Sequence, residues 1–156
     1  MGNKTLIAYE TKSGATEESA QKILQVLRSK YQLDVDMVDL KKQKNSDISG
    51  YGNIIVGGGV RAGKVYDKAL KFLEHDFSGK KVAFYISSGD AGTPEKYADA
   101  KAKFLEATLA KYPKVNPVAI EAFGGHAKIL GKTIVDNLDL NRVGAWAEEL
   151  GKKFTQ

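Results

Sequence analysis

The chain has 156 residues, of which 42% are hydrophobic and 28% charged, values typical of one globular domain rather than of a disordered or fibrous protein. Its 24 basic and 19 acidic residues give a net charge of +5, but the basic residues are scattered in pairs with acids between them, which argues against a nucleic-acid-binding surface. Cysteine is absent and histidine occurs twice, which excludes disulfides, thiolate ligands and cysteine nucleophiles and argues against a zinc site.

The first half of the chain predicts two strands joined by a helix. The β-prone run Thr5–Tyr9 predicts the first strand. Apolar residues at helical spacing then predict a helix whose buried face holds Ala20, Ile23, Leu24, Leu27 and Tyr31. Polar and apolar residues alternate over 33–38, which indicates an edge strand with one solvated face. Residues 41–49 carry no strong pattern and are interpreted as a short helix or a connection.

The second half continues the alternation of strands and helices. Apolar runs at 53–56 and 81–86 predict strands buried on both faces, and 115–123 predicts a fifth strand. Residues 127–137 are interpreted as an ambiguous connection, helical in part. Helical spacing predicts three more buried helix faces, formed by Val65, Ala69, Phe72 and Leu73, by Tyr97, Lys101, Phe104, Leu105, Leu109 and Tyr112, and by Val143, Trp146, Ala147, Leu150 and Phe154.

Strands that alternate with helices in this way predict an α/β fold. We expect one domain over residues 1–156, with a doubly wound, five-stranded parallel sheet in the order 2-1-3-4-5 and three layers, α/β/α. In this architecture ligands bind outside the carboxyl ends of the strands, at the switch between strands one and three. The loops after strands one, three and four are therefore the candidate site.

The first of these loops combines hydroxyl groups, one glycine and a helix start. Thr11, Ser13 and Thr16 supply hydroxyl donors, and Gly14 lets the backbone approach an anion closely or adopt a positive φ. The first N–H groups of a helix lack intrahelical partners and lie at the positive end of its dipole, so phosphate binds well there. The same residue types are also typical of an N-capped turn, and the loop alone leaves both interpretations open.

The loop predicted after the third strand argues against three classes of protein. A response regulator needs an Asp where Gly57 stands. The phosphate loop of nucleoside triphosphatases matches Gly58–Lys64 but needs Ser or Thr in place of Val65 to hold Mg²⁺. Gly57–Ala62 satisfies the short dinucleotide fingerprint Gly-x-Gly-x-x-Ala, but it follows the third strand rather than the first. One small domain would also leave little room for a separate substrate domain.

The pattern Tyr9-x-Thr11-x-Ser13-Gly14-x-Thr16, together with Gly89-Asp90, resembles the flavodoxin-like FMN-binding superfamily over nearly the whole chain. Within it, residues 57–64 and 122–125 are similar to the branch that contains flavodoxin-like, quinone-dependent protoporphyrinogen oxidase. The resemblance implies FMN as cofactor, with its phosphate in the first loop and its ring between the loops that begin at Gly57 and Ser87. The cofactor-binding residues that it implies are Thr11, Lys12, Ser13, Gly14, Ala15, Thr16, Gly57, Gly58, Gly59, Val60, Arg61, Ser87, Ser88, Gly89 and Asp90.

The resemblance also suggests how the protein would tune FMN. Rotation of the Gly57–Gly58 peptide would let a carbonyl accept the N5–H of reduced flavin, a change that glycine permits. Asp90 or nearby backbone groups would contact the pyrimidine end of the ring, where a negative charge lowers the reduction potential. Otherwise Asp90 is only an N-cap or a turn former. No aromatic residue occurs in 57–64; Tyr66 either stacks on the ring or simply covers the helix that follows. His126 either approaches the ring from the fifth loop or lies in a surface turn.

The charged residues near the predicted phosphate differ in what they offer. Glu10, Glu17 and Glu18 would oppose an anion, so neutral donors and Lys12 are expected to hold the phosphate. Arg61 contacts the phosphate, a partner or a substrate carboxylate, or is an ordinary exposed residue.

These observations predict a cytoplasmic, FMN-binding protein that carries one or two electrons between redox partner proteins. Acidic partner surfaces are expected because this chain is basic. The alternatives are a protoporphyrinogen-oxidase-like flavin dehydrogenase and an interaction domain without flavin. We expect no nucleic-acid partner, no metal and no membrane-spanning segment, because no apolar run approaches the roughly 20 residues that cross a bilayer. The sequence leaves open whether the protein is an electron carrier or an FMN-dependent oxidoreductase, and also what its oligomeric state is.

Overall fold

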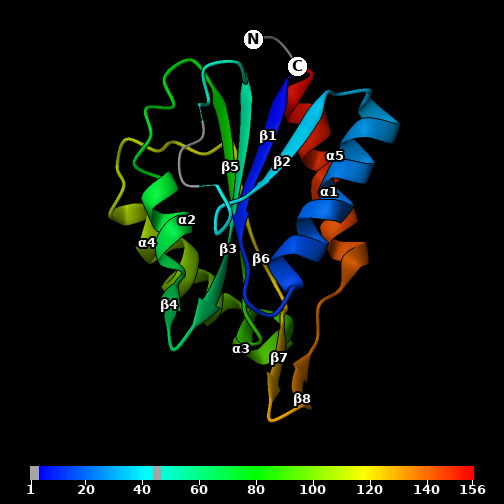
Figure 1. The fold of residues 1–156 in the computed structure, drawn as a ribbon, viewed down its shortest axis with the longest axis vertical. Coiled ribbons are helices and arrows are strands. Elements are labelled where there is room, and N and C mark those ends of the chain that lie inside the picture. Colours follow the sequence, from blue (N-terminus) through cyan, green and yellow to red (C-terminus); the bar gives the residue numbers. More distant parts are fainter. Residues whose placement is uncertain (1–3, 44–46) are drawn as a thin grey trace.

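The computed structural model describes residues 4–43 and 47–156 and has a central sheet of parallel strands. The strands are β1 (Thr5–Glu10), β2 (Val35–Asp39), β3 (Asn53–Arg61), β4 (Lys64–Val65), β5 (Lys81–Ser87) and β6 (Ala119–Phe123). Hydrogen-bonded neighbours follow the order β2-β1-β3-β5-β6, while the two-residue β4 pairs antiparallel with the end of β3 (Figure 1). Numbered among the parallel strands alone, this is the predicted order 2-1-3-4-5, so the predicted fold class is confirmed.

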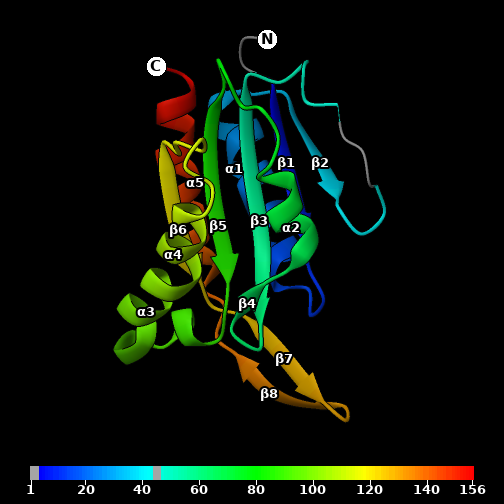
Figure 2. The same cartoon turned by 90° about the vertical axis from the view of Figure 1, so that its left-hand side faces the viewer.

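Helices cover both faces of the sheet (Figures 1 and 2). On one face α1 (Ala15–Tyr31) packs beside α5 (Leu140–Phe154). The other face carries α2 (Asp67–Phe72), α3 (Pro94–Ala100) and α4 (Ala107–Ala110), the last two joined by a π-helical segment at Lys101–Glu106. Two helical layers therefore enclose the sheet, which gives the three layers, α/β/α, that were predicted.

The core occupies both sides of the sheet because successive strand residues point to opposite faces. In β3, Ile54 and Val56 join the apolar cluster beneath α2, whereas Ile55 joins the cluster beneath α1 and α5, and all three are fully buried. The predicted apolar face of the last helix is confirmed, since its five residues are all buried in α5. In the α3–α4 region only Leu105 of the predicted face is fully buried, and its other residues are half-buried.

The strand β3 runs through the segment that was expected to be a loop. Residues from Gly57 to Arg61 pair within the sheet, and the chain turns only at Ala62 and Gly63, whose φ angles are 52° and 77°. Two consecutive positive φ angles are typical of the tight turn that joins twisted antiparallel strands, here β3 and β4. The expectation that Gly57 begins a loop is therefore wrong.

A β-hairpin occupies the segment that was interpreted as a partly helical connection. Its strands, β7 (His126–Ile129) and β8 (Lys132–Asp136), pair with each other and not with the central sheet. Leu130 and Gly131 have φ angles of 50° and 80°, which again gives a tight hairpin turn. The hairpin projects beyond the carboxyl ends of the parallel strands (Figures 1 and 2). The partly helical interpretation of 127–137 is therefore wrong.

Two other predicted segments are shorter or less regular than expected. The fifth parallel strand was predicted over 115–123, but β6 begins at Ala119. Of the segment 41–49, the described parts contain turns and no helix, and residues 44–46 lie outside the described residues.

No helix in the described ranges has the length and apolar character needed to cross a membrane.

Candidate functional site

A cavity of about 530 Å³ lies at the carboxyl edge of the sheet, where the loop after β1, the ends of β3 and β5 and the hairpin meet. Its size falls within the roughly 300–1,000 Å³ usual for small-molecule and cofactor sites. Of the predicted site residues, those that line it are Thr11, Lys12, Ser13, Ala15, Thr16, Gly59, Val60, Arg61, Ser87, Ser88 and Gly89. The structure therefore brings the three predicted segments together around one space, while Gly14, Gly57, Gly58 and Asp90 are not among its lining residues.

The loop after β1 presents the start of α1 to the cavity. Gly14 adopts a φ of 95° at the position before the helix, and its N–H donates to Thr11 Oγ1 at 2.9 Å, which closes the loop. Ala15 and Thr16 begin the helix and line the cavity. From beneath, the hydroxyl of the buried Tyr85 donates to the carbonyl oxygen of Thr16 at 2.8 Å. The helix start is thus held in place by the sheet and offers its free N–H groups to an anion.

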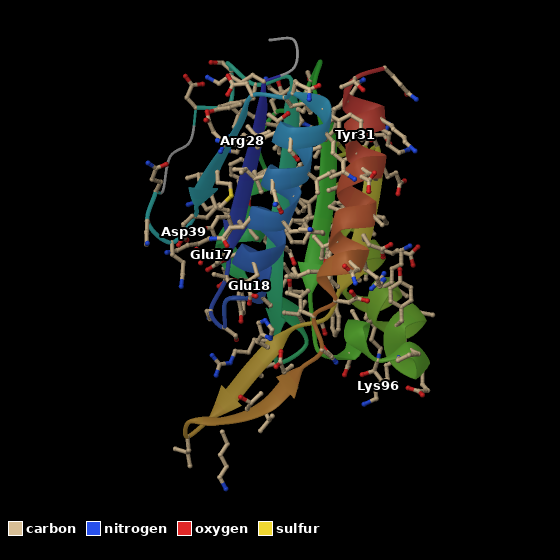
Figure 3. The ribbon with its side chains drawn as sticks, turned by 90° about the vertical axis from the view of Figure 1, so that its right-hand side faces the viewer. Glu17, Glu18, Arg28, Tyr31, Asp39 and Lys96 are labelled. Carbon is tan, nitrogen blue, oxygen red and sulfur yellow. The ribbon has the colours of Figure 1, made fainter. Side chains whose placement is uncertain are left out.

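The three glutamates that were expected to oppose an anion all have other partners. The carboxylate of Glu10 accepts hydrogen bonds from two backbone N–H groups at the start of α2, at 2.8 and 3.2 Å. Glu17 accepts one from the Tyr9 hydroxyl at 2.7 Å, and burial followed by Glu17 itself raises the pKa of that phenol. Glu18 lies 2.6 Å from Nε2 of His126. Glu17 and Glu18 project from the same end of α1 (Figure 3).

Two basic side chains and one aromatic ring line the cavity near the loop after β1. Nζ of Lys12 lies 4.5 Å from the centre of the Tyr66 ring, a cation–π arrangement. Tyr66 lines the cavity and is 9% exposed, and burial raises the pKa of its phenol. The exposed Arg61 lies at the end of β3 on the cavity rim. The cavity therefore carries two cations and an aromatic wall, and stacking of Tyr66 on a ring stays a prediction.

The glycines of β3 serve close packing inside the sheet. A Cβ on Gly57 would lie 2.3 Å from Cζ of Tyr85, and one on Gly58 would lie 2.9 Å from Cγ1 of Val65. Both residues pair with a parallel neighbour on each side, β1 and β5. The predicted rotation of the Gly57–Gly58 peptide would break this pairing, so the sheet opposes it. At Gly59, by contrast, the strand reaches the cavity.

The end of β5 brings a buried hydroxyl to the cavity. Ser87 is 5% exposed and lines the cavity, and its Oγ has no hydrogen-bond partner among the described residues. Oγ of Ser88 accepts from the N–H of Asp90 at 3.3 Å. The Asp90 carboxylate itself is largely exposed and lies 3.9 Å from Nζ of Lys96, away from the cavity lining. Its predicted contact with a ring stays a prediction.

The hairpin supplies the wall that sequence reasoning missed. Ala127, Ile134 and Val135 line the cavity together with His126, for which an approach from the fifth loop was one of two interpretations. A Cβ on Gly89 would lie 2.9 Å from Cγ1 of Val135, so the hairpin rests directly on the loop after β5. The β-branched run over 133–135 was the available strand signal.

The arrangement suits a molecule with an anionic end and a flat apolar part. The helix start and Lys12 favour the anion, and Tyr66, Val60 and the hairpin offer apolar walls. Ser87 adds a buried polar group that a ligand can engage. Within residues 4–43 and 47–156 no group of three His, Cys, Asp or Glu side chains is placed to hold a metal ion.

Comparisons with known proteins identify the family of this chain. A family model described as "Flavodoxin domain" matches residues 6–138. Among solved structures, oxidised flavodoxin 1 from Bacillus cereus is 20% identical with a TM-score of 0.66, and the match covers 96% of this chain and 97% of that chain. A flavodoxin from the domain Archaea is 17% identical with a TM-score of 0.66, covering 98% and 99%.

A third similar structure is a flavodoxin variant of Fusobacterium nucleatum bound to flavin mononucleotide. It is 21% identical with a TM-score of 0.60, and the match covers 97% of this chain and 96% of that chain. At these identities the three structures show the fold. A search of curated proteins found no match.

Proposed function

This chain belongs to the flavodoxin domain family, and from that premise we propose that its FMN binds in the carboxyl-edge cavity, with the phosphate at the start of α1. The protein is an FMN-binding electron carrier. FMN supplies reversible uptake of one or two electrons, and the protein supplies its position and surroundings. The observation that carries the proposed site is the meeting, in one cavity, of an open helix start and the unpartnered buried hydroxyl of Ser87.

The phosphate subsite uses the free N–H groups of α1, the hydroxyls of Thr11, Ser13 and Thr16, and the ammonium of Lys12. The pairing of all three nearby glutamates supports this assignment, because each carboxylate already has a hydrogen-bond partner within the protein. Lys12 lies over an aromatic ring, which holds its charge near the loop.

The ring subsite lies between the end of β3, at Gly59 and Val60, and the end of β5, at Ser87 and Gly89. The Ser87 hydroxyl would donate to or accept from a polar edge of the flavin ring, which would satisfy a group that is otherwise buried without a partner. Tyr66 and the hairpin would exclude water from the faces of the ring. A contact from Asp90 would require its carboxylate to leave Lys96.

Three measurements test this proposal. The purified protein should show flavin absorption that survives desalting, and the apoprotein should quench the fluorescence of added FMN. Riboflavin, which lacks the phosphate, should bind at least about a hundredfold more weakly, as expected for a charged group held by several hydrogen bonds. A protein that stays colourless and leaves FMN fluorescence unchanged would overturn the site, and equal binding of riboflavin would overturn the phosphate assignment.

Redox partner proteins with acidic docking surfaces are our proposal for the donor and acceptor. The exposed Lys12, Arg61 and Lys64 near the cavity rim support it, because cations around a redox cofactor attract acidic partners and raise their association rate. Rapid electron exchange with a flavoprotein reductase, slowed by added salt, is the expected behaviour. Exchange that is insensitive to salt would contradict the acidic-partner assignment.

The similarity of residues 57–64 and 122–125 to the protoporphyrinogen oxidase branch remains the finer alternative. It predicts that the FMN-loaded protein oxidises protoporphyrinogen and passes the electrons to an acceptor. A carrier turns over no small substrate under the same conditions. An assay of the loaded protein with protoporphyrinogen and a soluble quinone, compared with free FMN as control, separates the two.

A further inference from the structure

The hairpin β7–β8 is a separate part of the wall around the FMN cavity. It follows β6 and pairs with no strand of the central sheet (Figure 2). Residues from both of its strands line the cavity. An isolated two-stranded hairpin is at best marginally stable in water. Its position over the cavity therefore depends on the contacts that fasten it to the rest of the fold.

The base of the hairpin is fastened to the loop after β5. The side-chain amide of Asn137 donates to the carbonyl of Gly89 at 2.8 Å and accepts from the N–H of Gly125 at 3.0 Å. Val135 packs on Gly89. These contacts attach the hairpin to the β5 side of the cavity. Its contact with α1, on the other side, is made by a different residue.

That residue is His126, the first residue of β7. Its Nε2 lies 2.6 Å from Oε2 of Glu18 on α1, and its Nδ1 lies 2.8 Å from Oδ1 of Asp136 on β8. The imidazole also lines the cavity, and Glu18 lies near the helix start proposed for the phosphate, at the end of α1 closest to the hairpin (Figure 3). His126 thus joins the hairpin to α1 across the edge of the site.

Each of the two carboxylates needs an N–H donor from the imidazole, and a neutral imidazole cannot supply both. A protonated imidazole has two N–H donors and satisfies both carboxylates, whereas a neutral one has a single donor and leaves one carboxylate facing a lone pair. Lys12 and Arg61 are the other charged side chains of the same cavity, and Glu17, beside Glu18, is engaged by a tyrosine hydroxyl. The junction is therefore fully hydrogen-bonded only when the imidazole carries both protons.

We propose that His126 is a positioning residue that clips the hairpin to α1 over the bound FMN, and that the clip is closed when the imidazole is protonated. The proposal rests on the proposed function insofar as FMN is the group retained. Closed, the clip keeps the hairpin wall against the cavity and slows release of the cofactor. Open, the neutral imidazole keeps its one N–H on Nδ1, facing Asp136 of the hairpin itself, so the contact with Glu18 on α1 is lost and the hairpin is attached only at its base.

The first test measures the rate of FMN release at pH 5.5 and pH 8.5 in the wild type, His126→Gln, Glu18→Gln and the matched control His75→Gln. His75 is exposed and stacks edge-on against Phe72, whose ring centre is 4.7 Å away, outside the cavity lining. At pH 5.5 we expect His126→Gln and Glu18→Gln to release FMN about fivefold faster than the wild type, a modest factor because the carboxylates are partly exposed. At pH 8.5 the variants and the wild type should agree.

The comparison with each variant at the same pH removes the effect of the titrating FMN phosphate, which is common to all the proteins. His75→Gln should follow the wild type at both pH values. An equal acceleration in His126→Gln at both pH values would show a packing role without a protonation switch, and no acceleration at either would show that no clip exists. Either outcome overturns the proposal.

A second test needs no flavin. In the apoprotein, hydrogen exchange of the hairpin amides, corrected for the intrinsic effect of pH, should be about fivefold faster in His126→Gln than in the wild type at pH 5.5 and equal at pH 8.5. If the protein failed to bind FMN, the proposed function would fall while this measurement still decided the clip. Equal protection in the two proteins at pH 5.5 would overturn it.

Discussion

The cavity proposed for FMN has two walls of different construction. The sheet wall, formed by the loop after β1 and the ends of β3 and β5, continues directly into the core, where Thr16 is 1% exposed and Tyr85 fully buried. The hairpin wall, β7–β8, ends in Leu130, which is 98% exposed, and carries Ile134 at 56%. A buried wall holds its binding groups in place before the ligand arrives, whereas a weakly attached wall opens at low cost. The difference assigns recognition to the sheet wall and retention to the hairpin wall.

The largest effect is expected where the sheet wall is most tightly packed, at Gly57. In Gly57→Ala the new methyl group would lie 2.3 Å from the ring of Tyr85, which is itself buried and cannot move aside. We expect a loss of about 3 kcal/mol in the free energy of unfolding. Denaturant titration measures it.

Gly50→Ala is the control for this change, because nothing lies within 4 Å of a Cβ at that exposed turn. Its effect should stay within about 0.5 kcal/mol. A Gly57→Ala protein as stable as Gly50→Ala would mean that the sheet wall tolerates expansion, and the contrast with the hairpin would lose its basis.

Alkaline pH should destabilise the fold through Tyr9, near the end of β1. Burial followed by Glu17 raises the pKa of Tyr9, so above about pH 10 the unfolded chain releases this proton while the folded protein keeps it. The stabilisation that comes from the raised pKa of Tyr9 is complete below pH 10 and is lost as the pH rises further. The free energy of unfolding should therefore fall between pH 10 and 11.5, by up to about 1.4 kcal/mol per pH unit for one such group.

Tyr9→Phe tests the source of this pH dependence. The variant should flatten the alkaline slope by up to about 1 kcal/mol per pH unit, whatever its stability at pH 7. Chemical denaturation at several pH values gives both slopes. Identical slopes in the wild type and the variant would exclude Tyr9 as the group responsible.

A smaller effect is expected where the sheet wall supports the helix start. Tyr85→Phe removes the hydroxyl that donates to the carbonyl of Thr16 at 2.8 Å and leaves that buried carbonyl without this donor. We expect a loss of about 1.5 kcal/mol in stability. We also expect the affinity for FMN to fall by a larger factor than the affinity for riboflavin, because the helix start is the proposed phosphate subsite. Calorimetry with both ligands checks it, and an equal loss for the two would place the effect elsewhere than at the phosphate.

The same contrast decides how much could be predicted from sequence. The sheet wall was largely predictable, because buried parallel strands have continuous apolar runs and the loop after the first strand carries Gly14 between hydroxyl residues. Its one error, a loop at Gly57, arose because glycine usually interrupts strands, and the reason for glycine there is the ring of Tyr85, a contact between strands that sequence spacing does not reveal.

The hairpin wall was poorly predictable for physical reasons. Its turn, Leu130–Gly131, lacks the Asn-Gly or Asp-Gly pair that usually marks a two-residue hairpin. The partner that gives His126 its role, Glu18, lies 108 positions earlier in the chain. A clip between such distant residues depends on tertiary structure, so sequence reasoning left His126 between a ring contact and a surface turn.

The smallest effect is expected at the tip of the hairpin wall and should make the two walls more alike. Leu130 adopts a φ of 50°, a left-handed conformation that costs a leucine roughly 1 kcal/mol and an asparagine less. Because its side chain is 98% exposed, Leu130→Asn removes no packing from the core. We expect hydrogen-exchange protection of the hairpin amides to rise about threefold, with the global free energy of unfolding unchanged within about 0.5 kcal/mol.

Leu130→Val is the opposite variant. Valine is β-branched and disfavours positive φ, so the protection should fall instead. Equal protection in the two variants would mean that the turn does not limit the order of the hairpin, and the clip and the base contacts would then account for all of it.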